Sequence, residues 1–115
     1  MTGFEVTRRM DGDVAILHLK GFLDAHTAPD LERAIREVID MKSYQILVNF
    51  SALNYISSAG LGVFMGFVEE VRENSGDIRM SDMTPKVFKI FDLLGFPKLY
   101  RIFQEEQEAL ASFSS

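Results

Sequence analysis

An uncharged apolar run that leads into an apolar helical repeat is the strongest constraint on the fold of this chain. Residues 46–50 read ILVNF, and such a run, rich in branched apolar residues, is typical of a strand covered on both faces. After a polar bend, apolar residues recur at three- and four-residue steps and predict a helix from about Ser58 to about Glu73. A buried strand that feeds an amphipathic helix predicts an α/β fold. The expected apolar stripe of the helix consists of Leu61, Phe64, Met65, Val68 and Val71.

The start of this helix carries two hydroxyl groups. Ser57 or Ser58 can act as the N-cap, and the first turn then presents serine hydroxyls together with free backbone N–H groups. Such a turn suits an anion, or a residue that can become one. A serine before a helix is also an ordinary cap, and Gly60 and Gly62 fit close backbone packing equally well. Periodicity alone therefore does not reveal a function.

The rest of the chain alternates between strand and helix patterns. In chain order, the predicted elements are strands over 4–10 and 14–19, a helix that ends near residue 40, a strand over 46–50, the helix over 58–73, a strand over 78–83, a helix over 85–94, a strand or extended link over 99–103 and a helix over 104–113. The first helix is a crossover that should return the chain to a parallel strand. This order predicts a small mixed sheet of four to five strands with about four α-helices, as a single domain over residues 1–115.

Local signals mark the ends of several elements. Asp11-Gly12 is typical of a two-residue hairpin turn between the first two strands. Thr27, with Asp30 three residues later, is expected to form a capping box at the first helix. Thr84 is expected to open the helix over 85–94, and Gly95 is expected to end it.

The methionines and aromatic residues of the second half are expected to fill the core. A part of the aromatic set could instead flank a contact surface, and the methionines could form an adaptable binding surface. The residues concerned are Met65, Met80, Met83, Phe88, Phe91, Phe96 and Tyr100.

Composition excludes several classes of function. The net charge is −5 over 115 residues, whereas binding to nucleic-acid phosphates needs a basic surface. The chain has no cysteine, which excludes a disulfide framework and a thiolate metal site. It has no apolar run near the roughly 20 residues that span a bilayer, and no signal-peptide pattern. We therefore expect a cytoplasmic domain that binds neither nucleic acid nor membrane and holds no metal or cofactor.

Catalytic patterns are weak. His18 lies in a predicted strand and is interpreted as structural. His26 follows Asp24 closely, so a triad with Ser58 can be imagined, but no nucleophile-elbow pattern surrounds that serine. A P-loop is also absent, so tight ATP binding is not expected. The prediction is a protein that is not an enzyme.

Three motifs in order resemble one known family. Residues 54–63 read NYISSAGLGV and resemble the central signature of the STAS domain of bacterial anti-sigma factor antagonists. The resemblance extends upstream to residues 21–28, and downstream to residues 85–91 and Leu94-Gly95. It covers essentially the whole chain and implies the STAS fold. Ser57 stands where the family often has an aspartate, and Ala59 where a second hydroxyl residue often lies.

The resemblance also implies a function and a site. In that family the serine at the helix start is phosphorylated by an anti-sigma factor that is also a serine/threonine kinase. The matching residue is Ser58, with Ser57 as the second choice for the acceptor. The unphosphorylated chain would bind the anti-sigma factor and release a sigma factor, and a phosphatase would restore the active form. The expected partner-binding residues are Asp24, His26, Tyr55, Ser57, Ser58, Ala59, Gly60 and Leu61.

Two further expectations concern assembly. The chain is expected to be a monomer or a weak dimer. The alternative function is a STAS subunit of a lipid-transport ATPase or of a stress-signalling scaffold, in which the serine need not be phosphorylated.

Overall fold

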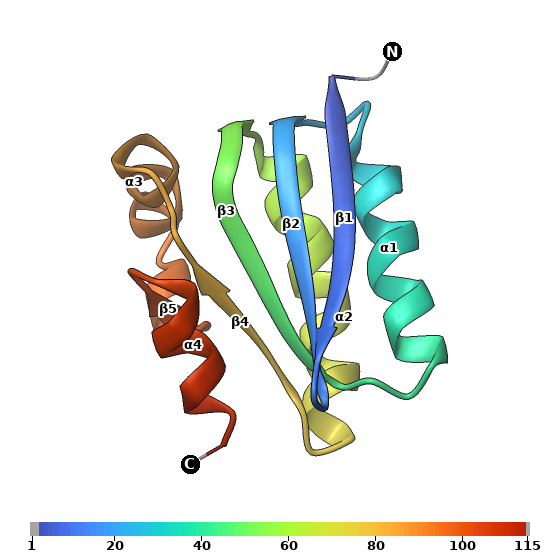
Figure 1. The fold of residues 1–115 in the computed structure, drawn as a ribbon. Coiled ribbons are helices and arrows are strands. Elements are labelled where there is room, and N and C mark those ends of the chain that lie inside the picture. The colour runs from blue at the N-terminus through green and yellow to red at the C-terminus, as the bar shows by residue number, and fades with distance from the viewer. Residues whose placement is uncertain (1–2, 115) are drawn as a thin grey trace.

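Five strands form one mixed sheet in which the spatial order of the strands is their order along the chain (Figure 1). The structure is a computed structural model and describes residues 3–114. Strands β1 and β2 pair antiparallel, and each later neighbouring pair is parallel. The predicted mixed sheet is therefore confirmed. The strands are β1 (Phe4–Asp11), β2 (Val14–Leu23), β3 (Gln45–Ile56), β4 (Asp77–Ser81) and β5 (Ile102–Phe103).

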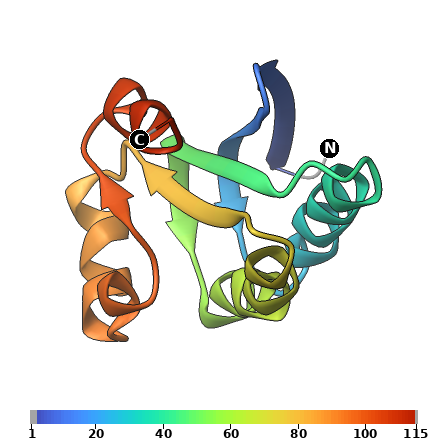
Figure 2. The same cartoon turned by 90° about the horizontal axis from the view of Figure 1, so that it is seen from below.

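The helices cover the two faces of the sheet unequally. Figure 2 shows α1, α2 and α3 on one face and α4 on the other. The first three lie on the connections between parallel strands, which need a crossover of this kind. The four predicted α-helices are all present. They are α1 (Ala28–Asp40), α2 (Ser58–Glu73), α3 (Pro85–Leu93) and α4 (Glu106–Ser112), with a short 3-10 helix, η1, over Phe96–Lys98.

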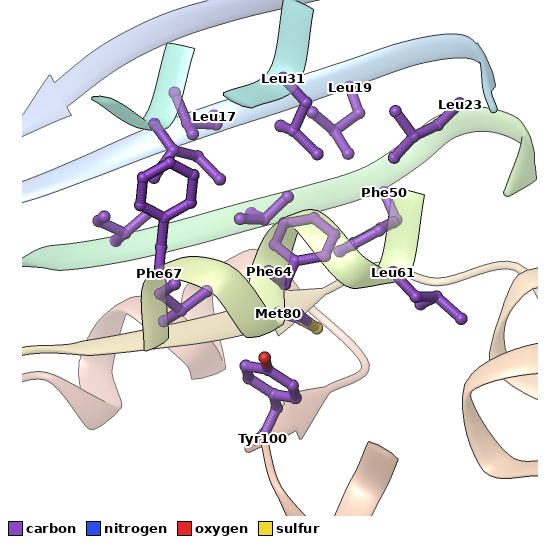
Figure 3. Close-up of a cluster of buried hydrophobic side chains, with 14 of the residues drawn as sticks. Leu17, Leu19, Leu23, Leu31, Phe50, Leu61, Phe64, Phe67, Met80 and Tyr100 are labelled. Atoms are coloured by element: carbon purple, nitrogen blue, oxygen red, sulfur yellow. The ribbon is translucent and has the colours of Figure 1, made fainter. Parts of the chain in front are cut away.

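The main core lies between the sheet and the three helices of the larger layer (Figure 3). In the first half of β2, Ala15, Leu17 and Leu19 contribute to this core, because side chains of a strand alternate between faces. Val14 and Ile16 on the other face cluster with Ala109 of α4, so the first half of β2 is apolar on both faces, as predicted. Residues that Figure 3 labels in the main core are Leu17, Leu19, Leu23, Leu31, Phe50, Leu61, Phe64, Phe67, Met80 and Tyr100.

A series of aromatic contacts runs through this core. The ring of Phe50 in β3 lies 5.9 Å from that of Phe64 in α2 and 5.4 Å from that of Phe91 in α3. The ring of Phe91 lies 5.6 Å from that of Phe96, which lies 5.7 Å from that of Tyr100. The contacts of Phe91 with Phe50 and with Phe96 are edge-to-face, and aromatic contacts of this kind add to the free energy of area burial. They connect the two halves of the helical layer through β3.

A polar network holds α4 against the opposite face. The carboxylate of Glu106 accepts hydrogen bonds from Arg9 at 2.6 Å and from the buried Asn49 amide at 2.9 Å. The imidazole Nε2 of His18 lies 3.4 Å from the same carboxylate. The Asn49 amide also donates to Asp82 at 3.1 Å. Hydrogen bonds from Asn49 and Arg9 overcome the desolvation of Glu106 and hold the pKa of that carboxyl below its usual value.

The predicted face of α2 was wrong in part. Met65 is 50% exposed, whereas Phe67 is buried. The cause is α1, which packs against α2 and places Arg36 over the Phe67 ring at 5.0 Å. The buried side of α2 therefore turns toward α1 as well as the sheet. Phe88, also expected in the core, is 40% exposed on α3.

Several predicted boundaries were short or shifted. β2 continues four residues beyond the predicted end and β3 six residues beyond it, because residues past the continuous apolar runs still pair across the sheet. The hairpin turn is Gly12-Asp13 rather than Asp11-Gly12, and Gly12 supplies the positive φ of 59°. The segment over 99–103 does contain a strand, β5, of two residues.

Candidate functional site

The surface that the sequence singled out lies at the edge of the sheet where β2 and β3 end. The last residues of these parallel strands, Leu23 and Ile56, face each other in register. Just beyond them, the backbone N–H of Ser57 donates to the carbonyl oxygen of Leu23 at 2.9 Å. The loop into α1 and the start of α2 therefore leave the sheet side by side, at the top of Figure 1. The carboxyl edge of parallel strands is the usual place for a binding site.

The loop into α1 is ordered by Asp24 and Thr27. One carboxylate oxygen of Asp24 accepts from the backbone N–H groups of His26 at 2.9 Å and Thr27 at 3.1 Å. In return, Oγ1 of Thr27 accepts from the backbone N–H of Asp24 at 3.0 Å and donates to the carbonyl oxygen of Phe22 at 2.9 Å. The Thr27 N–H contributes most to holding the pKa of Asp24 below its usual value, and partial burial opposes it. Asp24 is therefore a fixed anion at this edge.

The predicted capping box between Thr27 and Asp30 was wrong. The Thr27 side chain makes no capping bond to α1, because its hydroxyl is engaged by Asp24 and Phe22. Only the carbonyl oxygen of Thr27 accepts from the Asp30 N–H, at 2.9 Å. The predicted cap of α3 is confirmed, since Oγ1 of Thr84 accepts from the following turn.

The two serines at the start of α2 lie in different environments. Ser57 is the N-cap and has an extended backbone, but its hydroxyl makes no capping hydrogen bond. Its Oγ is buried and has no hydrogen-bond partner within residues 3–114. Ser58, the first helical residue, is exposed. Ser57 therefore holds the predicted N-cap position without the expected side-chain hydrogen bond, and Ser58 is the exposed serine.

The first turn of α2 packs tightly against the end of β2. A Cβ atom added to Gly60 would lie 2.6 Å from Cγ of Leu23, so a larger residue there must displace the buried Leu23 side chain. Leu61 is buried in the main core. Gly60 and Leu61 are therefore packing residues that lie beneath this surface. Gly62 has open space around it, so the close-packing interpretation holds for Gly60 and was wrong for Gly62.

An exposed aromatic pair borders these residues. Phe22 and Tyr55 face each other across β2 and β3 and are 52% and 42% exposed. Tyr55 was predicted as a site residue, whereas Phe22 was missed. Continued past Lys20, the alternation of β2 would have placed Phe22 on the face of the sheet opposite α1, α2 and α3. The predicted end of that strand at residue 19 concealed the signal.

The structure does not assemble the imagined catalytic triad. The carboxylate of Asp24 accepts from backbone N–H groups and the Thr27 hydroxyl, not from an imidazole. His18 lies on the face of the sheet that α4 covers, beside Glu106. The surface at the ends of β2 and β3 therefore presents the exposed Ser58, the fixed carboxylate of Asp24 and the exposed rings of Phe22 and Tyr55.

Two other features are absent from residues 3–114. Within that range, no group of three histidine or acidic side chains is placed to hold a metal ion. No helix among those residues is both long and apolar enough to cross a membrane.

Comparisons with known proteins agree on one family. The family model described as STAS domain matches residues 5–109. The anti-sigma F factor antagonist of Paenibacillus polymyxa is 30% identical over 98 residues, which cover 84% of each chain. The anti-sigma-B factor antagonist of Listeria monocytogenes is 28% identical over 102 residues, which cover 88% of this chain and 89% of the relative.

Solved structures show the same fold. An anti-sigma factor antagonist from Mycobacterium paratuberculosis superposes with a TM-score of 0.90 at 21% identity and covers 97% of this chain and 95% of its own. The anti-sigma factor antagonist SpoIIAA in its unphosphorylated form gives a TM-score of 0.82 at 23% identity, with 96% of each chain covered. The Bacillus SpoIIAA in the phosphorylated form gives 0.73 at 22% identity, with 95% of this chain and 99% of its own covered.

Proposed function

The chain belongs to the STAS domain family, and on that basis we propose that it is an anti-sigma factor antagonist that phosphorylation of Ser58 switches off. In the unphosphorylated form it binds an anti-sigma factor, which then releases a sigma factor. The names of its relatives support this assignment. The anti-sigma factor is also the serine/threonine kinase, and a separate phosphatase restores the active form. The chain is thus a substrate and a switch rather than an enzyme.

The observation that carries the proposal is the contrast between the two serines. Ser58 is exposed on the first turn of α2, beside the loop that holds Asp24. The Oγ atom of Ser57 is buried. A kinase needs an accessible hydroxyl, and a phosphoryl group on Ser57 would require the first turn to move away from β2. Ser58 is therefore favoured as the acceptor.

The free protein can accommodate a phosphoryl group on Ser58. The group brings close to two negative charges at neutral pH. It would lie at the N-terminus of α2, a helix of 16 residues, where the helix dipole and free N–H groups favour an anion. We therefore expect the fold to change little on phosphorylation. SpoIIAA, which has the same fold, has been solved in a phosphorylated form.

A bound partner responds differently to the same charge. A protein docked over Ser58 would have to desolvate the phosphoryl group next to the Asp24 carboxylate, without a matched cationic pocket. A loss of a few kcal/mol would weaken binding by a factor of roughly 100 to 1,000. The exposed rings of Phe22 and Tyr55 lie on the same edge, and aromatic side chains are enriched at protein interfaces. A local change of charge is thus a sufficient switch.

The direct test is phosphorylation by purified kinases. The chain is incubated with ATP, Mg²⁺ and each candidate anti-sigma kinase from the same genome, and the product is examined by intact and peptide-level mass spectrometry. We expect one phosphate on Ser58 in the parent and in Ser57→Ala, and none in Ser58→Ala. A phosphate on Ser57 would keep the function and move the site. No phosphorylation by any candidate would favour a STAS subunit of a transport ATPase or of a scaffold.

Binding of the same kinases to two variants tests the switch itself. Ser58→Ala should bind the partner constitutively in the presence of ATP, because it has no acceptor hydroxyl. Ser58→Asp should bind more weakly, by about tenfold or more, since a charge is placed at the docking surface. Isothermal titration calorimetry measures both affinities, with Ser57→Ala as the matched control. Parental affinity in both Ser58 variants would contradict the mechanism.

A further inference from the structure

β1 (Phe4–Asp11) is an edge strand of the five-stranded sheet. β1 is the first strand of the sheet, and within residues 3–114 only β2 pairs with it. Asp11 and Val14 face each other at the two-residue turn, and such a closing pair exchanges its backbone hydrogen bonds. At the other end, the carbonyl oxygen of Gly3 accepts from the Phe22 N–H at 2.9 Å. Both ends agree that odd-numbered residues of β1 bond to β2, so Val6, Arg8 and Met10 direct their backbone groups outward.

Symmetry and charge select one way for two copies of this edge to pair. In an antiparallel pair of two β1 strands, residues with outward backbone groups must lie opposite one another to exchange hydrogen bonds. Such residues are all even-numbered, so the two-fold axis that relates the copies has to pass through a residue of β1 rather than between two residues. An axis through Thr7 places Glu5 opposite Arg9 of the second copy, and this contact occurs twice. These residues lie in pairs that are not hydrogen-bonded, in which side chains approach most closely.

Neighbouring registers lack this complementarity. An axis through Arg8 places that residue opposite its own copy and places Glu5 opposite Asp11, so both contacts join like charges. An axis through Val6 places Glu5 opposite Thr7 and joins no opposite charges. Like charges directly opposite one another destabilise a strand pair. The register centred on Thr7 is thus the only one of the three that joins opposite charges.

A groove beside β1 fits the other face of the same strand. A surface groove of about 260 Å³ lies between exposed parts of β1 and α1. In the register centred on Thr7, Arg8 of the second copy falls opposite Val6, beside the carboxylate of Glu37 on α1. Met10, which is 44% exposed in the single chain, falls opposite Phe4 at the other end of the groove. The groove is lined by Phe4, Val6, Asp30, Arg33, Ala34 and Glu37.

We propose that two copies of this chain associate through antiparallel pairing of their β1 strands about Thr7. Ion pairs between Glu5 and Arg9 fix the register, and Met10 and Arg8 of each copy fill the groove of the other. Arg9 keeps one nitrogen for Glu106 and has further donors for Glu5, because a guanidinium carries five N–H groups. One eight-residue strand per copy is a small contact compared with about 800 Å² per partner in a standard interface. The dimer is therefore weak and depends on concentration.

Single-cysteine variants test the register, because the chain has no native cysteine. Thr7→Cys places its Cα about 4.5 Å from its own copy across the axis, within disulfide range. Glu5→Cys lies four residues, or about 13 Å, from its own copy and cannot cross-link without movement. Under mild oxidation we expect a covalent dimer of Thr7→Cys on a non-reducing gel. We expect none of Glu5→Cys or Arg9→Cys alone, but a mixed dimer when those two are combined.

Charge reversal without cysteine gives an independent readout. Glu5→Arg and Arg9→Glu each join like charges in a homodimer, so each should raise the dimer dissociation constant about tenfold or more. A mixture of the two variants restores both ion pairs and should restore the dimer. Sedimentation velocity over a concentration series measures all four samples, and circular dichroism checks that each variant is folded.

Two results would overturn the proposal. One is a parent chain that sediments as a monomer at every concentration at low ionic strength. The other is equal cross-linking of the three single-cysteine variants, which random collision would produce. These measurements do not involve Ser58 or a kinase, so their failure is independent of the proposed function.

Discussion

At the scale of single residues, Gly60 decides how closely α2 approaches β2. Gly60→Ala would place a methyl group against the fully buried Leu23 and should destabilise the fold by about 1–3 kcal/mol. Gly62→Ala is the matched control, because its new methyl group meets no atom within 4 Å. Alanine is the better helix former, so that variant should gain up to about 1 kcal/mol. Urea denaturation measures both, and equal effects would contradict the packing argument.

The environments of Ser57 and Ser58 could not be predicted from the sequence motif. Adjacent serines read as equivalent caps in the sequence, yet neither side chain caps α2 and only one is exposed. The difference comes from the extended backbone at Ser57 and from its bond to Leu23 in a strand 34 residues earlier. Contacts at that separation leave no local signal in the sequence.

At the scale of elements, the Glu106 network makes the docking of α4 dependent on pH. The folded pKa of Glu106 is lowered, so its contribution to stability is present above the unfolded value near 4.5 and is lost as the pH falls through the folded value. Glu106→Gln should cost about 1–2 kcal/mol at pH 7. The difference from the parent should shrink below pH 4.5.

Denaturation at pH 7 and at pH 3.5 measures this difference. Glu108→Gln is the control, because that exposed residue lies on the same helix and forms no ion pair within the described chain. It should follow the parent at both pH values. If Glu106→Gln differed from the parent by the same amount at both pH values, the carboxylate would not be the source of the stability.

The type and order of the helices and strands were predicted correctly from the sequence, whereas several of their ends were not. Apolar periodicity identified β3 and α2, since one buried strand and one amphipathic helix have distinct repeats. It ended β2 and β3 too early, because Lys20 and Tyr55 look like loop residues although their backbones pair within the sheet. It also placed Met65 in the core, because the packing of α1 on α2 cannot be read from one helix alone.

At the scale of the whole molecule, the aromatic series makes α3 part of one cooperative unit. Phe91 lies in the middle of that series and is fully buried. Phe91→Ala should cost about 3–5 kcal/mol, a large share of the 5–15 kcal/mol that holds a typical domain. Phe88→Ala, one turn earlier and 40% exposed, should cost about 1 kcal/mol or less.

Thermal melting followed by circular dichroism compares these two variants with the parent. A single transition at a clearly lower temperature is expected for Phe91→Ala, and a small shift for Phe88→Ala. A second, separate transition in Phe91→Ala would show that α3 unfolds on its own and would contradict the cooperative role of the rings.

The strictly sequential order of the strands has a consequence for how the chain acquires its structure. Each strand pairs with the one made just before it, so no later strand has to insert between two that are already joined. The β1–β2 hairpin closes the shortest loop and can form first, and the sheet can then grow in the direction of synthesis. The ion pair between Arg9 and Glu106 spans 97 residues and must wait until α4 has been made. It joins β1 to α4, so it can form only after all five strands of the sheet are present.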